Sequence, residues 1–226
     1  MARFDRLQVL NTVLDDGLVP LFFNSSLETA QQIAGALHKG GSRVLEFTNR
    51  GDFAIEVFGA LVKDCAQHLP ELILGVGSVE DAATAALFIV YGANFVVGPN
   101  FNPEIARLCN RRKIAYMPGC GTVTEIANAE EWGVEIVKIF PGETIGGPDF
   151  VKAVRGPRPW TRLMPTGGVS TEEANLRAWF DAGVACVGIG SGLIRADWVK
   201  AGDYAAIQSE TQTVLQRIRA VRGTKP

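Results

Sequence analysis

The chain has 226 residues, of which 47% are hydrophobic and 20% charged, with a formal net charge of −2. This length suits one larger domain or two small ones, and the hydrophobic fraction excludes a chain too polar to build a core. The slightly acidic balance gives nucleic acid no general electrostatic attraction, so we expect no nucleic-acid partner.

The first expected element is an amphipathic helix over residues 1–16, which has the pattern of a helix and not of a signal peptide. No apolar run approaches the length of a membrane span. The four cysteines form no CxxC pair, which favours free thiols in a reducing compartment. We therefore expect a soluble cytoplasmic protein with no membrane partner.

Eight short apolar runs follow along the chain, and each is followed by a turn signal and a helical stretch. They cover residues 18–23, 43–48, 72–77, 94–99, 114–119, 134–140, 162–167 and 185–190. Ser25 with Glu28 predicts a capping box at the first of these helices. With no linker between the units, the pattern predicts one α/β domain, a (β/α)8 TIM barrel over 17–222 preceded by the extra N-terminal helix. The alternative is an open doubly wound sheet, but "GIGSGL" (188–193) lacks the full dinucleotide-binding spacing.

A lysine interrupts the sixth apolar run, "VEIVKIF" (134–140). Burying the ammonium of Lys138 is unfavourable unless it is paired or loses its proton. In the second run, Glu46 also lies among apolar residues. The layers of a barrel draw side chains from alternate strands, and both strands are even-numbered. Glu46 and Lys138 could therefore face each other in one layer near the C-terminal ends of the strands, where barrel active sites lie.

Two readings of this pair remain open. A partly desolvated lysine is a nucleophile that can form a Schiff base with a ketone, and a nearby carboxylate can transfer the protons. The same two residues could instead form a structural ion pair inside the barrel, because such pairs also perturb pKa values.

The turns after the seventh and eighth strands are rich in glycine. "PTGGV" (165–169) and "GSGL" (190–193) would expose backbone N–H groups to an anion, at a place where barrels commonly bind phosphate. Ser191 adds a hydroxyl donor. Arg50, just beyond Glu46, could bind a carboxylate through two hydrogen bonds. The alternatives are two ordinary barrel turns and a solvated loop arginine.

Six segments in this order resemble the 2-keto-3-deoxy-6-phosphogluconate (KDPG) and 4-hydroxy-2-oxoglutarate (KHG) aldolases. They are "LEFTNR" (45–50), "GVGSV" (75–79), "VVGPNF" (96–101), "PGCGTVTE" (118–125), "VKIFPGE" (137–143) and "MPTGGV" (164–169). The resemblance runs through essentially the whole barrel. It implies a trimeric class I enzyme without metal or other cofactor, which cleaves a phosphorylated 2-keto-3-deoxy sugar acid to pyruvate and glyceraldehyde 3-phosphate. Cleavage of KHG to pyruvate and glyoxylate is a further expectation.

The resemblance also implies roles for individual residues. Lys138 would form the Schiff base and Glu46 would act as acid and base, while Arg50 would hold the pyruvate carboxylate. The other expected contacts are Ser78 (where the family commonly has threonine), Pro99 and Thr166 at the pyruvyl end, and Gly167, Gly168, Gly190 and Ser191 at the phosphate.

Departures from the family pattern at Asn49, Gly142 and Gly192 bear on the aldehyde half of the substrate. "PGCGT" is similar to the phosphogalactonate aldolases, whereas Thr48 and Arg50 favour the gluconate branch.

Three other functions remain as alternatives. One is a metal-dependent aldolase, for which the two histidines supply no ligand cluster. The others are a barrel isomerase or decarboxylase, and a non-catalytic barrel that binds a sugar phosphate.

Overall fold

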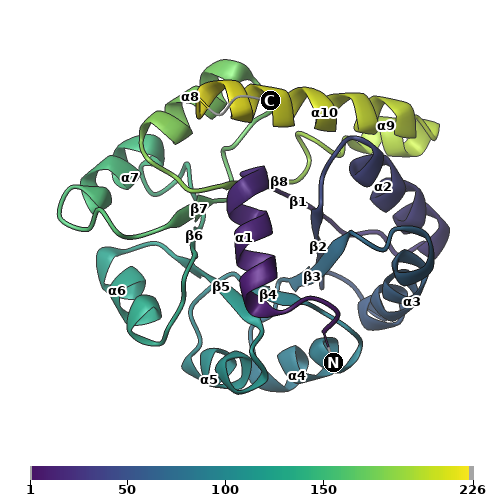
Figure 1. The fold of residues 1–226 in the computed structure, drawn as a ribbon, viewed down its shortest axis with the longest axis horizontal. Helices are drawn as coiled ribbons and strands as arrows, with labels where there is room; N and C mark the ends of the chain where they lie inside the picture. Colours follow the sequence, from purple (N-terminus) through teal and green to yellow (C-terminus); the bar gives the residue numbers. More distant parts are fainter. Residues whose placement is uncertain (1, 224–226) are drawn as a thin grey trace.

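The computed structural model describes residues 2–223, and its eight parallel strands form a nearly closed barrel inside a ring of helices (Figure 1). The strands are β1 Leu18–Phe22, β2 Val44–Thr48, β3 Ile73–Gly77, β4 Phe95–Gly98, β5 Ala115–Cys120, β6 Val137–Ile139, β7 Leu163–Pro165 and β8 Val187–Ile189. Their spatial order is β7-β6-β5-β4-β3-β2-β1-β8, and a bridge between Thr166 and Gly188 connects the two ends. The predicted (β/α)8 barrel is confirmed.

The helices alternate with the strands. They are α1 Arg6–Asp16, α2 Leu27–Lys39, α3 Ala54–His68, α4 Ala82–Val90, α5 Pro103–Arg112, α6 Val123–Glu131, α7 Gly147–Arg155, α8 Glu173–Asp181, α9 Ala196–Ala201 and α10 Tyr204–Val221. Every residue of the eight strands is buried, as expected for a parallel sheet that is covered on both faces. No helix within residues 2–223 is long and apolar enough to cross a membrane.

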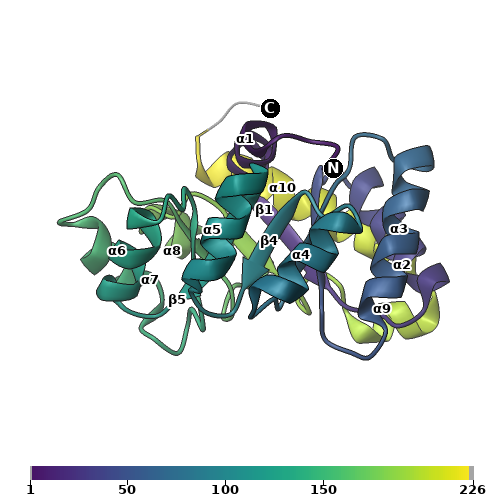
Figure 2. The same cartoon turned by 90° about the horizontal axis from the view of Figure 1, so that it is seen from below.

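Helix α1 covers the amino-terminal end of the barrel (Figures 1 and 2). Its side chains Val9, Leu10 and Val13 belong to the same buried cluster as Val44 and other residues at the starts of strands. Arg43, just before β2, donates from its backbone N–H and its Nε to the buried Asp16 carboxylate at 3.0 and 2.8 Å. Because α1 closes this end, the carboxyl-terminal end of the barrel is the one left for a ligand.

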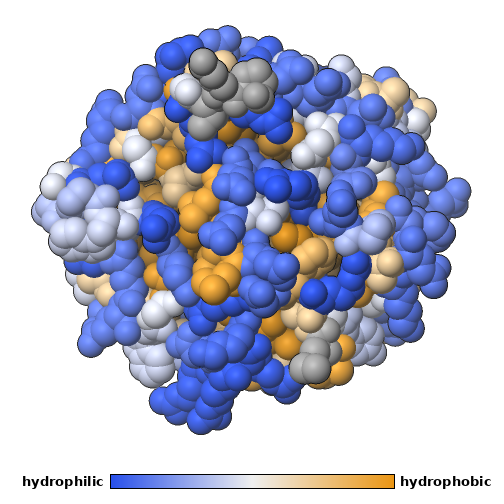
Figure 3. Space-filling view, in the orientation of Figure 1, coloured by the Kyte–Doolittle hydropathy of each residue, from blue (hydrophilic) through white to orange (hydrophobic). Residues whose placement is uncertain are grey.

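The face that carries α1 is shown with its side chains in Figure 3. Hydrophilic residues cover the rim of this face, and apolar residues are visible mainly toward its middle, around α1.

The predicted capping box at Ser25 is wrong by one residue. Ser26 is the N-cap of α2, and its hydroxyl accepts a hydrogen bond from the Thr29 N–H at 3.2 Å. The Ser26 N–H in turn donates to the side chain of Asn24 at 2.8 Å. A loop of consecutive polar residues offers several possible caps, and the path of the chain out of β1 selects one of them.

Candidate active site

Glu46 and Lys138 both point into the barrel interior. Two residues earlier in the chain, Val44 on β2 and Ile136 just before β6 belong to the inner cluster beside α1. The intervening Leu45 and Val137 pack outward against the helices. Side chains alternate along a strand, so Glu46 and Lys138 lie one layer above that inner cluster. They are 1% and 5% exposed.

The carboxyl group of Glu46 is held in an unfavourable environment. Burial raises its pKa above the ordinary value, and the positive charges of Lys138 and then Arg50 oppose that shift. Its Oε2 atom has no hydrogen-bond partner among the described residues, and no ion pair joins it to Lys138. A buried carboxyl that is near an ammonium yet free of direct partners can still take up and release a proton.

Arg50 and Ser78 form a contact at the ends of β2 and β3. The Nε of Arg50 donates to the Ser78 hydroxyl at 3.2 Å. Ser78 adopts a left-handed backbone conformation with φ 58°, which is uncommon for a residue with a side chain. A strained backbone conformation persists only where the surrounding structure holds it in place, and such residues are found most often at active sites and ligand sites.

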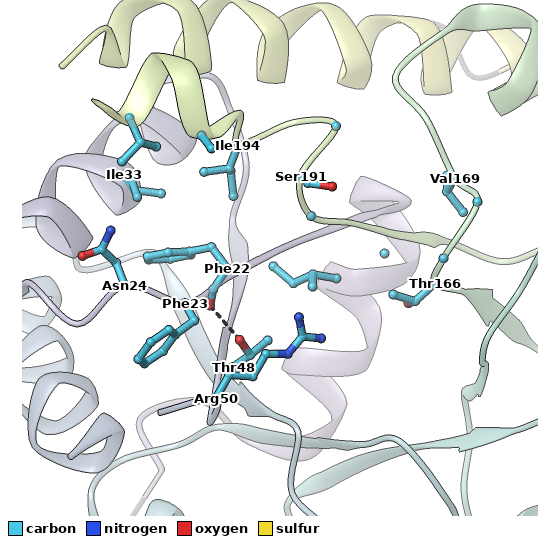
Figure 4. Close-up of a pocket in the computed structure, with 18 of the residues that line it drawn as sticks. Phe22, Phe23, Asn24, Ile33, Thr48, Arg50, Thr166, Val169, Ser191 and Ile194 are labelled. Atoms are coloured by element: carbon cyan, nitrogen blue, oxygen red, sulfur yellow. Dashed lines mark hydrogen bonds between the residues drawn. The ribbon is translucent and has the colours of Figure 1, made fainter. Parts of the chain in front are cut away.

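A cavity of about 630 Å³ opens at the carboxyl-terminal end of the barrel (Figure 4). Its lining consists of Leu21, Phe22, Phe23, Asn24, Ile33, Thr48, Arg50, Phe140, Thr166, Gly167, Gly168, Val169, Gly188, Gly190, Ser191, Gly192, Ile194, Ala196, Val199 and Lys200. It brings together six of the ten site residues expected from the sequence: Arg50, Thr166, Gly167, Gly168, Gly190 and Ser191. The other four, Lys138, Glu46, Ser78 and Pro99, are not part of this lining.

Lys138 and Glu46 lie directly below the cavity. Thr48 at the end of β2 and Phe140 just after β6 lie two residues beyond Glu46 and Lys138, and both are part of its lining. The Thr48 hydroxyl donates to the Phe22 carbonyl at 3.3 Å (Figure 4), and the Lys138 Nζ lies 5.1 Å from the centre of the Phe140 ring. Phe140 had no predicted role, although its sequence spacing of two from Lys138 predicts the same face of the chain.

The turn after β7 is held by the turn after β6. Gly142 and Glu143 donate their N–H groups to the carbonyls of Thr166 and Gly167 at 2.9 and 3.1 Å. A Cβ atom at Gly142 would lie 2.8 Å from the Gly167 carbonyl oxygen, closer than real Cβ contacts. Glycine at position 142, one of the departures noted in the sequence, therefore permits this close approach of two backbones.

Other candidate nucleophiles near the site are less suitable. Cys120 ends β5, and burial raises the pKa of its thiol to about 12, so it remains protonated at neutral pH. Of the described residues, no group of three or more His, Cys, Asp or Glu side chains could hold a metal ion.

The model of the family described as KDPG and KHG aldolase matches residues 9–210. The chain belongs to this family. A KHG/KDPG aldolase from Escherichia coli (strain K12) is 36% identical over 92% of both chains, and a 2-dehydro-3-deoxy-phosphogluconate aldolase from Treponema pallidum is 33% identical over 88% of this chain and 92% of its own. The family resemblance predicted from the sequence is confirmed, and the protein is an aldolase and thus a lyase.

Solved structures of the family are similar over most of the chain. A KDPG aldolase from Legionella pneumophila, with pyruvate captured at low pH as a covalent carbinolamine intermediate, has a TM-score of 0.82, 27% identity, and coverage of 90% of this chain and 96% of that one. One from Zymomonas mobilis with 3-phosphoglycerate has a TM-score of 0.77, 25% identity, and coverage of 91% and 94%. A native KDPGal structure has a TM-score of 0.80, 25% identity, and coverage of 90% and 95%.

Proposed function

We propose that this aldolase is a class I enzyme that cleaves 2-keto-3-deoxy-6-phosphogluconate to pyruvate and glyceraldehyde 3-phosphate, with Lys138 as the Schiff-base lysine and Glu46 as the proton-transfer group. The observation that carries the assignment is the placement of both groups in one buried layer, directly below the cavity at the carboxyl-terminal end of the barrel. The carbinolamine in the Legionella pneumophila relative supports covalent capture of pyruvate by an amine.

The chemistry follows from the lysine. Uncharged Lys138 Nζ attacks the C2 ketone to give a carbinolamine, and loss of water gives an iminium ion. The iminium withdraws the electron pair of the C3–C4 bond as the C4 hydroxyl loses its proton, so that bond breaks and the aldehyde leaves. The remaining enamine takes a proton at C3, and water then releases pyruvate and the free amine. Because the iminium itself withdraws the electron pair of the C3–C4 bond, the cleavage needs no metal ion for this purpose, and we assign no role to a metal.

Glu46 suits the proton transfers of this sequence. Its raised pKa brings the carboxyl closer to the pH at which it can act both as an acid and as a base. The same group would serve at carbinolamine formation, at dehydration, at C3–C4 cleavage and at protonation of the enamine.

The two ends of the cavity would hold the two ends of the substrate. Arg50, oriented by Ser78, would bind the pyruvyl carboxylate, with Thr166 and Pro99 beside it. The Thr166 hydroxyl oxygen is buried and has no partner within residues 2–223, so it is available for a ligand. Gly167, Gly168, Gly190 and Ser191 would bind the phosphate, an assignment supported by the 3-phosphoglycerate in the Zymomonas mobilis relative.

Two other substrates have specific support. The KDPGal structure and the "PGCGT" segment favour the galactonate form as the second candidate, and the E. coli relative favours KHG as an additional substrate. A panel of the three keto acids, compared by kcat/KM, separates them, and we expect the highest value with the gluconate form.

We also propose a homotrimer in the cytoplasm, as the family resemblance implies. Exposed apolar side chains on and just after α4, Leu87, Val90 and Tyr91, offer a surface that a second copy could cover. Sedimentation analysis should give three times the chain mass of 24.3 kDa. A species of a single chain mass at micromolar concentration would contradict the trimer.

Covalent trapping tests the central assignment. Pyruvate followed by borohydride should reduce the iminium and leave a stable adduct, which peptide mass spectrometry should locate on Lys138. The Lys138→Ala variant should fold normally, lack the adduct and lose turnover, whereas Lys63→Ala, on the exposed surface of α3, should behave like the parent. An adduct on another lysine would refute the assignment.

A further inference from the structure

The cavity extends past the turn after β8, on the side away from the turn after β7. We call this part the α2–α9 lobe and define it by its lining residues Phe22, Asn24, Ile33, Ile194, Val199 and Lys200. Figure 4 shows Asn24, Phe22 and Ile33 on the side of the cavity away from Thr166 and Val169, with Ser191 between the two sides. Most of the lobe is apolar, and its polar groups are Asn24 and Lys200.

The charges around the cavity have one sign. Arg50 and Lys200 line it, and none of the described lining residues is an aspartate or a glutamate. Arg50 comes from the end of β2, and Lys200 comes from the last turn of α9. A cavity with a cation from each of two separate elements, and no acid in its lining, favours a ligand that carries two anionic groups.

The ammonium of Lys200 is available for such a group. The acidic residue one turn earlier, Asp197, is occupied by Arg195, whose Nε and Nη2 donate to the two carboxylate oxygens at 3.0 and 2.6 Å. Within the described part of the chain, Lys200 has no hydrogen bond or ion pair. Its charge is therefore not neutralised by a neighbouring side chain.

The side chain of Asn24 is oriented as a donor. Its Oδ1 accepts the N–H of Ser26 at 2.8 Å, and a backbone N–H can only donate, so the oxygen of the amide must lie on that side. The Nδ2 group has no partner among the described residues and presents its N–H groups. Two donors, one charged and one neutral, therefore line a lobe that contains no acidic side chain.

We infer that Asn24 and Lys200 bind the far, oxyanion-bearing end of the acceptor aldehyde, and so make the enzyme selective for a phosphorylated over an unphosphorylated sugar acid. The inference rests on the proposed function, because it needs a substrate whose carboxylate is held near Arg50. A phosphate beside Ser191, which lies between the two sides of the cavity, would meet neutral donors from the glycine turns and a positive charge from Lys200. A charge distinguishes a dianionic phosphate from a hydroxyl group more strongly than a neutral donor does.

Matched variants and matched substrates test this assignment. The substrates are 2-keto-3-deoxy-6-phosphogluconate and unphosphorylated 2-keto-3-deoxygluconate, which have the same carbon chain. The variants are Lys200→Ala, Lys200→Arg and Asn24→Ala, and the control is Lys152→Ala, which removes an exposed lysine on α7 outside the cavity lining.

Lys200→Ala should raise KM for the phosphorylated substrate about 3- to 10-fold, a range that allows for solvent screening of an exposed cation. Its kcat should stay within twofold of the parent, because the reacting atoms are not touched. Asn24→Ala should raise the same KM about 2- to 5-fold. Neither variant should change kcat/KM for the unphosphorylated acid by more than twofold. Lys200→Arg, which keeps the charge, should retain most of the affinity.

The outcomes separate this inference from the proposed function. If the parent neither cleaves the phosphorylated substrate nor traps pyruvate on Lys138, the proposed function fails. If the parent does both, but Lys200→Ala matches Lys152→Ala on both substrates, only the lobe assignment is overturned. Equal losses on the two substrates would overturn it as well, because they would show that the lobe does not recognise phosphate.

Discussion

A Cβ atom at position 77 would lie 1.7 Å from Oε1 of Glu46, so the missing side chain of Gly77 makes the space that this carboxyl group occupies. The two residues lie on neighbouring strands, β3 and β2, whose register pairs Glu46 with Gly75 and Thr48 with Gly77. The position of Glu46, the proposed proton-transfer group, is therefore set by a residue that carries no functional group.

Replacing Gly77 with alanine should displace the Glu46 carboxyl group. A displacement of about 1 Å from a productive geometry can lower the rate by about 10²-fold, and we expect a loss of kcat of that order. Gly77 is not among the glycines with positive φ, so the effect would come from steric contact and not from backbone strain. Steady-state kinetics and thermal unfolding should be measured together.

The matched control for this change is Gly35→Ala. A Cβ atom at Gly35 in α2 would meet no atom within 4 Å, and alanine in a helix interior is more favourable than glycine by roughly 0.5–1 kcal/mol. The control should therefore keep full activity and gain a little stability. A Gly77→Ala variant with kcat within twofold of the parent would mean that the position of Glu46 is not critical.

Glu46→Gln should preserve pyruvate binding and slow proton transfer by about 10²–10⁴-fold. The amide has nearly the same shape as the carboxyl group but cannot shuttle a proton. Exchange of the pyruvate methyl protons with deuterated water, followed by NMR, isolates this step from C–C cleavage. Exchange at a near-normal rate in the variant would remove Glu46 from the proton-transfer role.

The same substitution should stabilise the fold in a pH-dependent way. Burial raises the pKa of Glu46 in the folded state above 4.5, so the folded state binds this proton more tightly than the unfolded state does. Stability therefore falls as the pH rises from the ordinary glutamate pKa through the folded-state pKa, and the loss is complete above the latter. Glutamine carries no titrating proton and avoids this loss.

Thermal unfolding should show the difference directly. At pH values above the folded-state pKa of Glu46, the Glu46→Gln variant should have a higher Tm than the parent. The difference should be about 2–4 °C for each kcal/mol by which the substitution raises the free energy of unfolding. The gap should shrink as the pH falls toward and below 4.5. A gap that widened on acidification would mean that the pKa shift has the opposite sign.

The sequence predicted the barrel because alternation of strand and helix signals is a local property. It also predicted that Glu46 and Lys138 share a layer, since the parity of side chains along a strand follows from backbone geometry alone. The contact between Gly77 and Glu46 depends on how neighbouring strands are staggered, and no local pattern reports that stagger. No sequence pattern indicated a role for Lys200, because its place in the cavity lining depends on how α9 packs beside the barrel.

Of the residues proposed to bind the phosphate, Ser191 can be substituted with less disturbance of the fold than Gly168 can. Gly168 has φ 78°, and a Cβ atom there would lie 2.2 Å from the Glu143 Cβ. A substitution such as Gly168→Val would therefore disturb the fold as well as the site, and a loss of activity would not report on phosphate alone. Ser191, whose side chain is exposed in the cavity lining, avoids this problem.

Ser191→Ala should remove one hydrogen bond to the phosphate and leave the backbone turn intact. A single hydrogen bond contributes about 0.5–1.5 kcal/mol, which corresponds to about a 2- to 12-fold loss of kcat/KM with the phosphorylated keto acid. Cleavage of 4-hydroxy-2-oxoglutarate should be unchanged, since Lys138 and Glu46 are not altered and this substrate has no phosphate. Ser209→Ala, on the exposed surface of α10, is the control for serine removal. If Ser191→Ala lowers kcat/KM equally for both substrates, the hydroxyl serves the reaction centre, and the turn after β8 is not the phosphate site.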